Sequence, residues 1–144
     1  MTRHPQLDLD LQLCFPLYAT ARAVTRAYAP LLEPHGLTYP QYLTLLALWS
    51  GPETMTVGEI GDRLRLDSGT LTPVLKRLES AGHVERRRDV DDERRVLVSL
   101  TPAGDALQDE LAQVPGQVAT SLGLTLEEST QLRALLDRVL ANLS

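Results

Sequence analysis

The chain has 144 residues, of which 43% are hydrophobic and 23% charged, and its formal net charge is −5. This length suits one folded domain with a hydrophobic core, and a single cysteine cannot form a disulfide within the chain. No stretch approaches the roughly 20 apolar residues of a membrane helix, and the opening MTRHPQLDLD lacks the apolar run of a signal peptide, so we expect a cytoplasmic protein without membrane contact.

The amino-terminal part of the chain predicts two helices. Apolar residues spaced three and four apart predict a first helix over about residues 8–32. Pro16 fits such a helix only in its first turn or at a kink, so the helix either begins later or bends near Cys14. Thr38 is expected to cap a second helix that runs through about Ser50.

Two further helices are predicted in the middle of the chain. Residues 56–66 have the pattern of a short third helix, and residues 66–82 that of a fourth. Asp67 or Ser68 is the expected cap of the fourth helix, and Gly82 is expected to end it.

A change of period after the fourth helix predicts a β-hairpin. Residues 83–88 and 94–100 have strand-like patterns, and an acidic turn over 89–93 separates them. Helix, tight turn, helix and hairpin is the order of a winged helix-turn-helix. The predicted fold class is therefore mainly α with a small β-hairpin wing, an α+β fold.

The carboxyl-terminal part is expected to be helical again. Residues 101–114 have a helical pattern, which Pro115 and Gly116 are expected to interrupt. Residues 125–143 predict a terminal amphipathic helix, whose first residues fit a capping box.

The distribution of charge favours nucleic acid, although the total does not. Residues 56–100 hold 9 of the 14 basic residues, and their 9 acidic residues make the segment neutral. The second helix of such a pair enters the major groove with its N-terminus first, and a wing arginine, best Arg94, can enter the minor groove. Exposed basic residues on a helix are also often only a solvated face. The residues expected to contact double-stranded operator DNA are Ser68, Gly69, Thr70, Thr72, Lys76, Arg77, Arg86 and Arg94.

Three stretches resemble a known family. The stretch DDERRVLVSLTPAG is similar to the wing and following helix of the MarR family of winged-helix repressors. The stretches LCFPLYATARAVTRAYAPLLEPHGLTYPQYLTLLALW and LDSGTLTPVLKRLESAG resemble more narrowly the organic hydroperoxide resistance regulators, OhrR, of the one-cysteine type. That resemblance implies a homodimeric repressor that responds to peroxide at an N-terminal cysteine, a position that Cys14 occupies. Pro16 departs from the family's pattern.

The resemblance also implies one domain over residues 1–144. About 1–35 and 101–144 are expected to form the dimerisation helices, and about 38–100 the winged helix-turn-helix that binds DNA.

Cys14 and the tyrosines pose a geometric question. Cys14 and Tyr28 lie 14 residues apart, or about 21 Å along one helix, so they cannot touch within a chain. An antiparallel partner helix with a two-fold axis near Ala21 would pair them across a dimer. This register agrees with what the resemblance implies, namely that Tyr28 and Tyr39 of one subunit donate hydrogen bonds to the Cys14 sulfur of the other.

A thiolate at Cys14 could attack an organic hydroperoxide, the expected inducer, and become a sulfenic acid. The chain has no second thiol, so a small cellular thiol, a backbone nitrogen or another chain must react next. The simpler reading of a lone cysteine is a small buried hydrophobic residue. The residues expected to line the peroxide pocket are Phe15, Leu17, Tyr18 and Trp49.

Two alternatives compete with this hypothesis. A repressor of the same fold could be released by a non-covalent phenolic ligand. A thiol peroxidase would share the chemistry, but the sequence offers no resolving thiol, and we expect a protein that is not an enzyme. We expect no cofactor and no metal, because the histidines are scattered at His4, His35 and His83.

Overall fold

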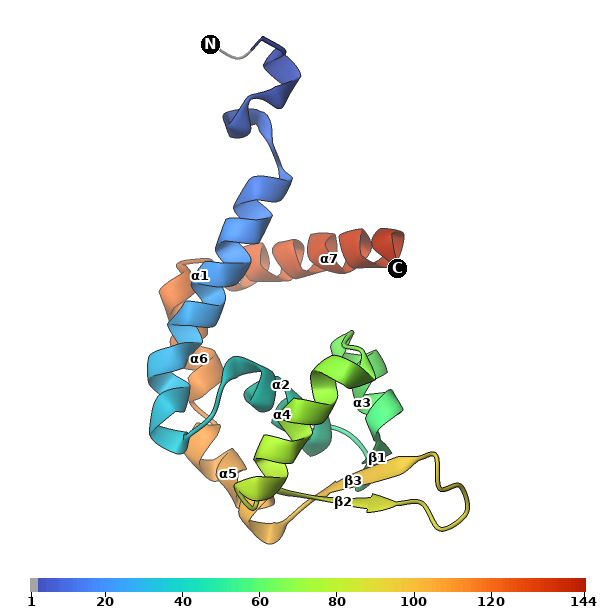
Figure 1. Cartoon of the computed structure of the whole chain (residues 1–144). Coiled ribbons are helices and arrows are strands. Elements are labelled where there is room, and N and C mark those ends of the chain that lie inside the picture. The colour runs from blue at the N-terminus through green and yellow to red at the C-terminus, as the bar shows by residue number, and fades with distance from the viewer. Residues whose placement is uncertain (1–2) are drawn as a thin grey trace. The chain divides into compact units, whose positions relative to one another are not determined.

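A computed structural model describes residues 3–144, which divide into two compact units at Leu111 and Ala112 (Figure 1). None of the described helices is both long and apolar enough to cross a membrane. The first unit contains helices and a small sheet, and the second contains only helices. The elements are α1 (Cys14–Leu32), α2 (Tyr39–Trp49), β1 (Thr54–Thr56), α3 (Val57–Leu64), α4 (Ser68–Ser80), β2 (Val84–Arg88), β3 (Val96–Leu100), α5 (Pro102–Leu111), α6 (Val114–Leu122) and α7 (Leu126–Leu143).

Helix α1 begins later than predicted. The expected start near Asp8 is wrong, because two short 3₁₀ turns, Pro5–Leu7 and Leu9–Leu11, precede the helix, which starts at Cys14. This start makes Pro16 the third helical residue. The first four N–H groups of a helix have no partner within it, so a proline there costs no hydrogen bond.

Side-chain caps fix the starts of the next three helices. Thr38 and Gln41 form a capping box at α2, and Thr56 and Glu59 form another at α3. Asp67 caps α4, because its carboxylate accepts a 2.7 Å hydrogen bond from the Thr70 backbone N–H. Of the two expected caps, Asp67 and Ser68, the first is therefore the N-cap.

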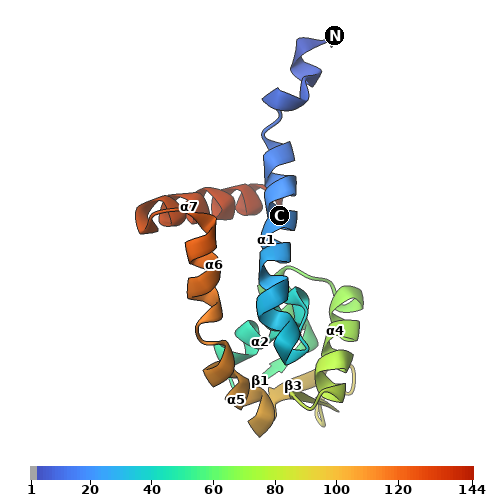
Figure 2. The same ribbon diagram turned by 90° about the vertical axis from the view of Figure 1, so that its left-hand side faces the viewer.

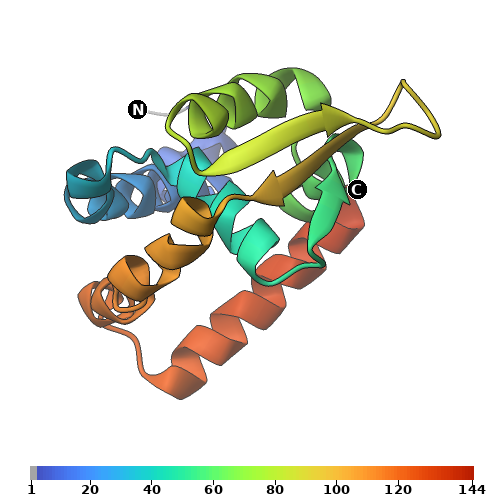
Figure 3. The ribbon, with the colours of Figure 1, turned by 90° about the horizontal axis from the view of Figure 1, so that it is seen from below.

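The sheet has one more strand than predicted. Strands β2 and β3 form the expected antiparallel hairpin, which projects beyond the helices of the first unit (Figure 3). Strand β1 pairs antiparallel with the other side of β3, with Met55 opposite Val98, so the order is β1-β3-β2. Three residues are too few to show a period in the sequence, which is why β1 was not predicted.

The first unit has its core where α2, α3 and α4 meet the sheet. The carboxyl-terminal end of α1 joins this core, whereas its amino-terminal half projects away from it in Figures 1 and 2. The most deeply buried large side chains of the unit are those of Leu32, Tyr42, Leu45, Ile60, Leu71, Leu75, Leu78, Val84 and Val98.

The second unit differs from the prediction at its start. The predicted interruption is present but slightly earlier than expected, at residues 112–113, and Pro115 and Gly116 lie in the first turn of α6, where proline is well tolerated. Gly123, at φ +68°, ends this helix. The predicted capping box of Thr125 and Glu128 starts α7.

Helix α7 carries an exposed apolar stripe. The side chains recur at helical spacing, so they lie on one face, and all are exposed to solvent. They are Leu132, Leu135, Leu136, Val139, Leu140 and Leu143.

Candidate functional site

The start of α4 presents small polar residues to solvent. Ser68, Gly69 and Thr70 are exposed, and Thr72 is half-exposed and donates a 2.7 Å hydrogen bond from its hydroxyl to the Ser68 carbonyl oxygen. Hydrogen bonds from Thr70 lower the pKa of the Asp67 carboxyl, so this cap is ionised at neutral pH. Further along the same helix, the side chains of Lys76 and Arg77 are also exposed.

Within the wing tip, acidic and basic side chains hold the turn together. Arg95 pairs with the nearly buried Asp89 at 3.4 Å, and the guanidinium of Arg88 donates to the Glu93 carbonyl oxygen at 2.8 Å. Arg94 pairs with Asp92 at 3.1 Å, which lowers the pKa of that carboxyl, yet the Arg94 side chain is 91% exposed. The acidic residues of the tip therefore shape the turn while Arg94 stays accessible.

Arg86 has a different environment from the one expected. Its guanidinium donates to the Glu79 carboxylate at 3.0 Å and 3.3 Å, and its backbone N–H donates to the same carboxylate. These bonds lower the pKa of Glu79 and join α4 to β2. The charge of Arg86 is thus paired with Glu79 within the chain, whereas the side chain of Arg94 is exposed.

Three tyrosines form one aromatic cluster between α1 and α2. The ring of Tyr28 lies 4.6 Å from that of Tyr39 and 5.5 Å from that of Tyr42, measured between centroids. Tyr28 and Tyr39 are half-buried, whereas Tyr42 is only 1% exposed. The hydroxyl of Tyr42 is buried and has no hydrogen-bond partner among the described residues.

Burial raises the pKa of these phenols, which are protonated at neutral pH. It raises the pKa of Tyr28 and of Tyr39, and it raises the pKa of Tyr42 to about 12. A phenol whose pKa lies above its usual value stays a hydrogen-bond donor at neutral pH. The two half-buried hydroxyls can therefore donate to an anion that reaches them.

Cys14 is exposed at the first position of α1, far from this cluster in its own chain. One continuous helix contains both Cys14 and Tyr28, so about 21 Å separates them along the axis. Phe15, Leu17 and Tyr18 beside the thiol are also exposed, and Tyr18 stacks against the Arg22 guanidinium at 5.6 Å. A single chain therefore brings Tyr28 and Tyr39 together, but it does not bring the Cys14 thiol to them.

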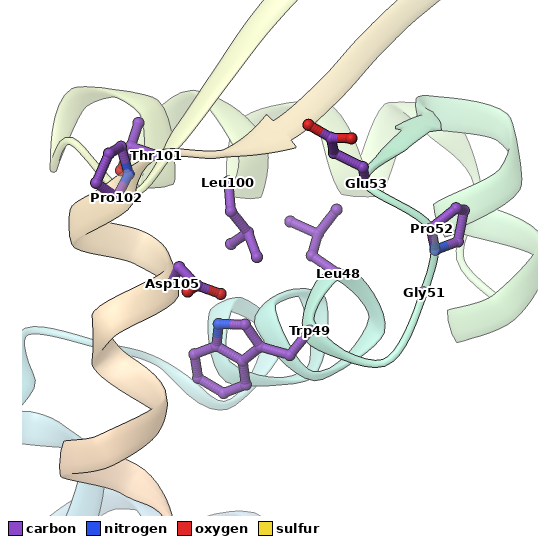
Figure 4. A pocket seen from close by; sticks show the side chains of 9 residues that line it. All are labelled: Leu48, Trp49, Gly51, Pro52, Glu53, Leu100, Thr101, Pro102 and Asp105. Atoms are coloured by element: carbon purple, nitrogen blue, oxygen red, sulfur yellow. The ribbon is translucent and has the colours of Figure 1, made fainter.

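Trp49 lies elsewhere, in a cavity of about 380 Å³ between the end of α2, the following loop, the end of β3 and the start of α5 (Figure 4). Its indole N–H donates to the Gly104 carbonyl oxygen at 3.1 Å. Ten residues of α2 separate Trp49 from Tyr39, or about 15 Å. Within one chain Trp49 is thus not brought to the phenol cluster. Among residues 3–144, no three His, Cys, Asp or Glu side chains are grouped to hold a metal ion.

Sequence reasoning missed two features of these surfaces. It did not place Tyr42 beside Tyr28 and Tyr39, although the spacing of Tyr39 and Tyr42 on one helix face was a signal that they would share a cluster. It also gave no partner to Arg86, because nothing local links that residue to Glu79.

Comparison with known proteins places the chain among transcriptional regulators. The model of a family described as transcriptional regulator SarA/Rot matches residues 26–111. The chain is 55% identical over 132 residues to the HTH-type transcriptional regulator TtmR of Methylorubrum extorquens, spanning 92% of the chain but only 66% of TtmR, less than two thirds of its length.

Two further proteins match over most of their own length. The organic hydroperoxide resistance transcriptional regulator of Bacillus subtilis is 49% identical over 129 residues, which is 90% of this chain and 85% of that protein. The structure of a mutant MarR from E. coli complexed with operator DNA is similar with a TM-score of 0.81 and 32% identity, over 92% of this chain and 99% of the MarR chain.

Proposed function

Because the chain belongs to the MarR family of transcriptional regulators, and within it to the one-cysteine organic hydroperoxide resistance regulators, we propose that it is a homodimeric repressor that releases operator DNA when an organic hydroperoxide oxidises Cys14. The relatives are transcriptional regulators, which argues against the thiol peroxidase alternative. In this proposal about 1–35 and 101–144 mediate dimerisation and about 38–100 bind DNA.

The phenol cluster is the observation that carries this proposal. Tyr28 and Tyr39 lie in ring contact with protonated hydroxyls, and the exposed Cys14 of the same chain is about 21 Å away. Two α1 helices crossing antiparallel near Ala21 would bring each thiol to the tyrosines of the partner. The site is then complete only in the dimer.

Exposed apolar surfaces support a dimer. The projecting half of α1 exposes large apolar side chains around Cys14, and α7 exposes its stripe of leucines and valine. Isolated apolar side chains are common on protein surfaces, but contiguous ones at helical spacing are typical of interaction sites. A second copy of the chain would cover both surfaces.

The oxidation step follows from the chemistry of a thiolate. The helix N-terminus and two phenol O–H groups favour the anionic sulfur, which attacks the outer peroxide oxygen. The S–O bond forms as the O–O bond breaks, the leaving alkoxide takes up a proton to become an alcohol, and Cys14 becomes a sulfenic acid. A small cellular thiol can then condense with it, releasing water and leaving a mixed disulfide. In this proposal Phe15, Leu17 and Tyr18 form apolar walls for the peroxide, whereas Trp49, which lies in its own cavity about 15 Å from Tyr39 along α2, is not part of them.

DNA release follows from geometry. The starts of the two α4 helices must enter successive major grooves about 34 Å apart. A mixed disulfide between crossing α1 helices would displace the phenols and change this spacing, so a small rotation of the subunits would be enough for release.

A mobility-shift titration tests the proposal. The reduced protein, with DNA from upstream of its own gene, is expected to form a complex that cumene hydroperoxide dissociates. Salicylate at matched concentration is expected to leave the complex intact. No complex with reduced protein, or a complex that persists after the thiol titre has fallen to zero, would contradict the proposal, whereas release by salicylate with an unchanged thiol titre would support the non-covalent alternative.

The two wing arginines are expected to respond differently to alanine. Arg94→Ala should weaken operator binding about tenfold, because it removes an accessible cation. It should also lower by about one the slope of the logarithm of the binding constant against the logarithm of the salt concentration. The exposed ion pair of Arg94 with Asp92 contributes little to stability, so the fold should not change. Arg86→Ala should instead lower the melting temperature, because it leaves Glu79 without its partner. Fluorescence anisotropy with labelled operator at several salt concentrations, and calorimetry, measure the two effects. An unchanged salt slope for Arg94→Ala would remove it from the interface.

A further inference from the structure

Helices α2, α4 and α5 meet at one hydrogen-bonded junction in the first unit. The indole N–H of Trp49, the last residue of α2, donates to the Gly104 carbonyl oxygen of α5 at 3.1 Å, and Figure 4 shows the Trp49 ring beside α5. The Thr101 hydroxyl, just before α5, donates to the Gly82 carbonyl oxygen beyond the end of α4 and accepts from the Gly104 N–H. We define the junction as Trp49, Gly82, His83, Thr101 and Gly104.

The two sides of the junction are joined in different ways. On the α4 side, a Cβ atom at Gly104 would overlap the His83 carbonyl oxygen, so only glycine lets the two backbones come this near. The same His83 oxygen accepts a 3.0 Å hydrogen bond from the Thr101 N–H. On the α2 side, the Trp49 N–H makes the one hydrogen bond that joins α2 to α5 among residues 3–144.

The junction lies on the path from the dimer interface to the DNA. In the proposed function about 101–144 mediate dimerisation, and α5 leads along the chain into the second unit. A mixed disulfide that repacks the interface therefore displaces α5. Helix α4, whose start is expected to enter the major groove, follows α5 only as far as the junction holds.

We propose that Trp49 is a positioning residue for DNA release, because its hydrogen bond to Gly104 makes α2 and α4 follow α5 when the dimer interface repacks. This inference rests on the proposed function. An oxidised dimer can keep both α4 helices on the operator only if α5 shifts against α2, and that shift breaks the bond. The bond is intact in the reduced protein and in the oxidised protein free of DNA. Its loss therefore destabilises the oxidised complex alone, which strengthens release.

Trp49→Phe tests this role, because phenylalanine keeps an aromatic ring but has no N–H. The variant should lose thiol to cumene hydroperoxide at the wild-type rate, and its reduced form should bind operator within about twofold of the wild type. The ratio of the dissociation constants of oxidised and reduced protein should fall about three- to tenfold, the strength of one hydrogen bond. Anisotropy with labelled operator gives both constants, the oxidised protein being prepared with cumene hydroperoxide and glutathione.

Ser50→Ala is the matched control at the same end of α2. The Ser50 hydroxyl accepts a 2.8 Å hydrogen bond from Arg63 of α3, so this substitution removes a bond that does not reach α5, and the ratio should stay at the wild-type value. Thr101→Val removes both hydroxyl hydrogen bonds of the junction and should lower the ratio as Trp49→Phe does.

An unchanged ratio for Trp49→Phe, with or without a lower melting temperature, would show a merely structural bond and overturn the inference. So would slower loss of thiol in Trp49→Phe, or an equal fall of the ratio in Ser50→Ala. Should Trp49→Phe not fold, Thr101→Val decides in the same way. Wild-type protein that keeps the operator after oxidation would instead overturn the proposed function itself, and this inference with it.

Discussion

Cys14→Ser is expected to bind operator DNA within about twofold of the wild type and to keep that complex in the presence of cumene hydroperoxide. The side chain is exposed at the start of α1, so the substitution disturbs no core packing. Serine cannot form a sulfenic acid, and no other thiol exists in the chain to replace the one removed. The expected loss of the peroxide response is therefore complete.

Anisotropy with labelled operator measures this effect, with peroxide added to preformed complexes of both proteins. Cys14→Ala serves as a second variant, since it removes the hydroxyl that serine could offer to the tyrosines. Normal release by either variant would show that the peroxide acts somewhere other than Cys14.

The second large effect is expected at the phenols. A protein carrying both Tyr28→Phe and Tyr39→Phe should lose thiol to cumene hydroperoxide about 10- to 100-fold more slowly, because two hydrogen bonds to the anionic sulfur are removed. Stopped-flow loss of thiol titre gives the rate. Tyr42→Phe is the matched control: it removes a hydroxyl that has no partner among the described residues, so the rate should not change.

A mixed dimer tests whether the site forms between chains. We pair a Cys14→Ser subunit with a subunit carrying both phenylalanine substitutions and purify the heterodimer with two tags. Its one thiol then faces the intact tyrosines of the other chain, and it should react at the wild-type rate. A rate as slow as that of the doubly substituted homodimer would mean that Tyr28 and Tyr39 do not act across the interface.

Local patterns in the sequence were enough to predict most of the helices and the hairpin. Capping boxes such as that of Thr125 and Glu128 join residues three apart, so they form wherever the helix starts, whatever packs against it. The fixed rise of a helix likewise showed that Cys14 and Tyr28 cannot meet within one chain. The apolar spacing alone did not decide where α1 starts. The rule that Pro16 belongs in a first helical turn favours the later start.

Only the tertiary structure decided the contacts between residues that are distant along the chain. Tyr42 joins Tyr28 because α1 and α2 pack together, Arg86 turns to Glu79 because β2 lies beside α4, and β1 exists because it pairs with β3. Trp49 faces a cavity lined by Glu53 and Asp105 because the start of α5 closes over the end of α2. Such contacts depend on how elements are oriented against each other, which is set by the sum of many packing interactions and has no signature in a short stretch of sequence.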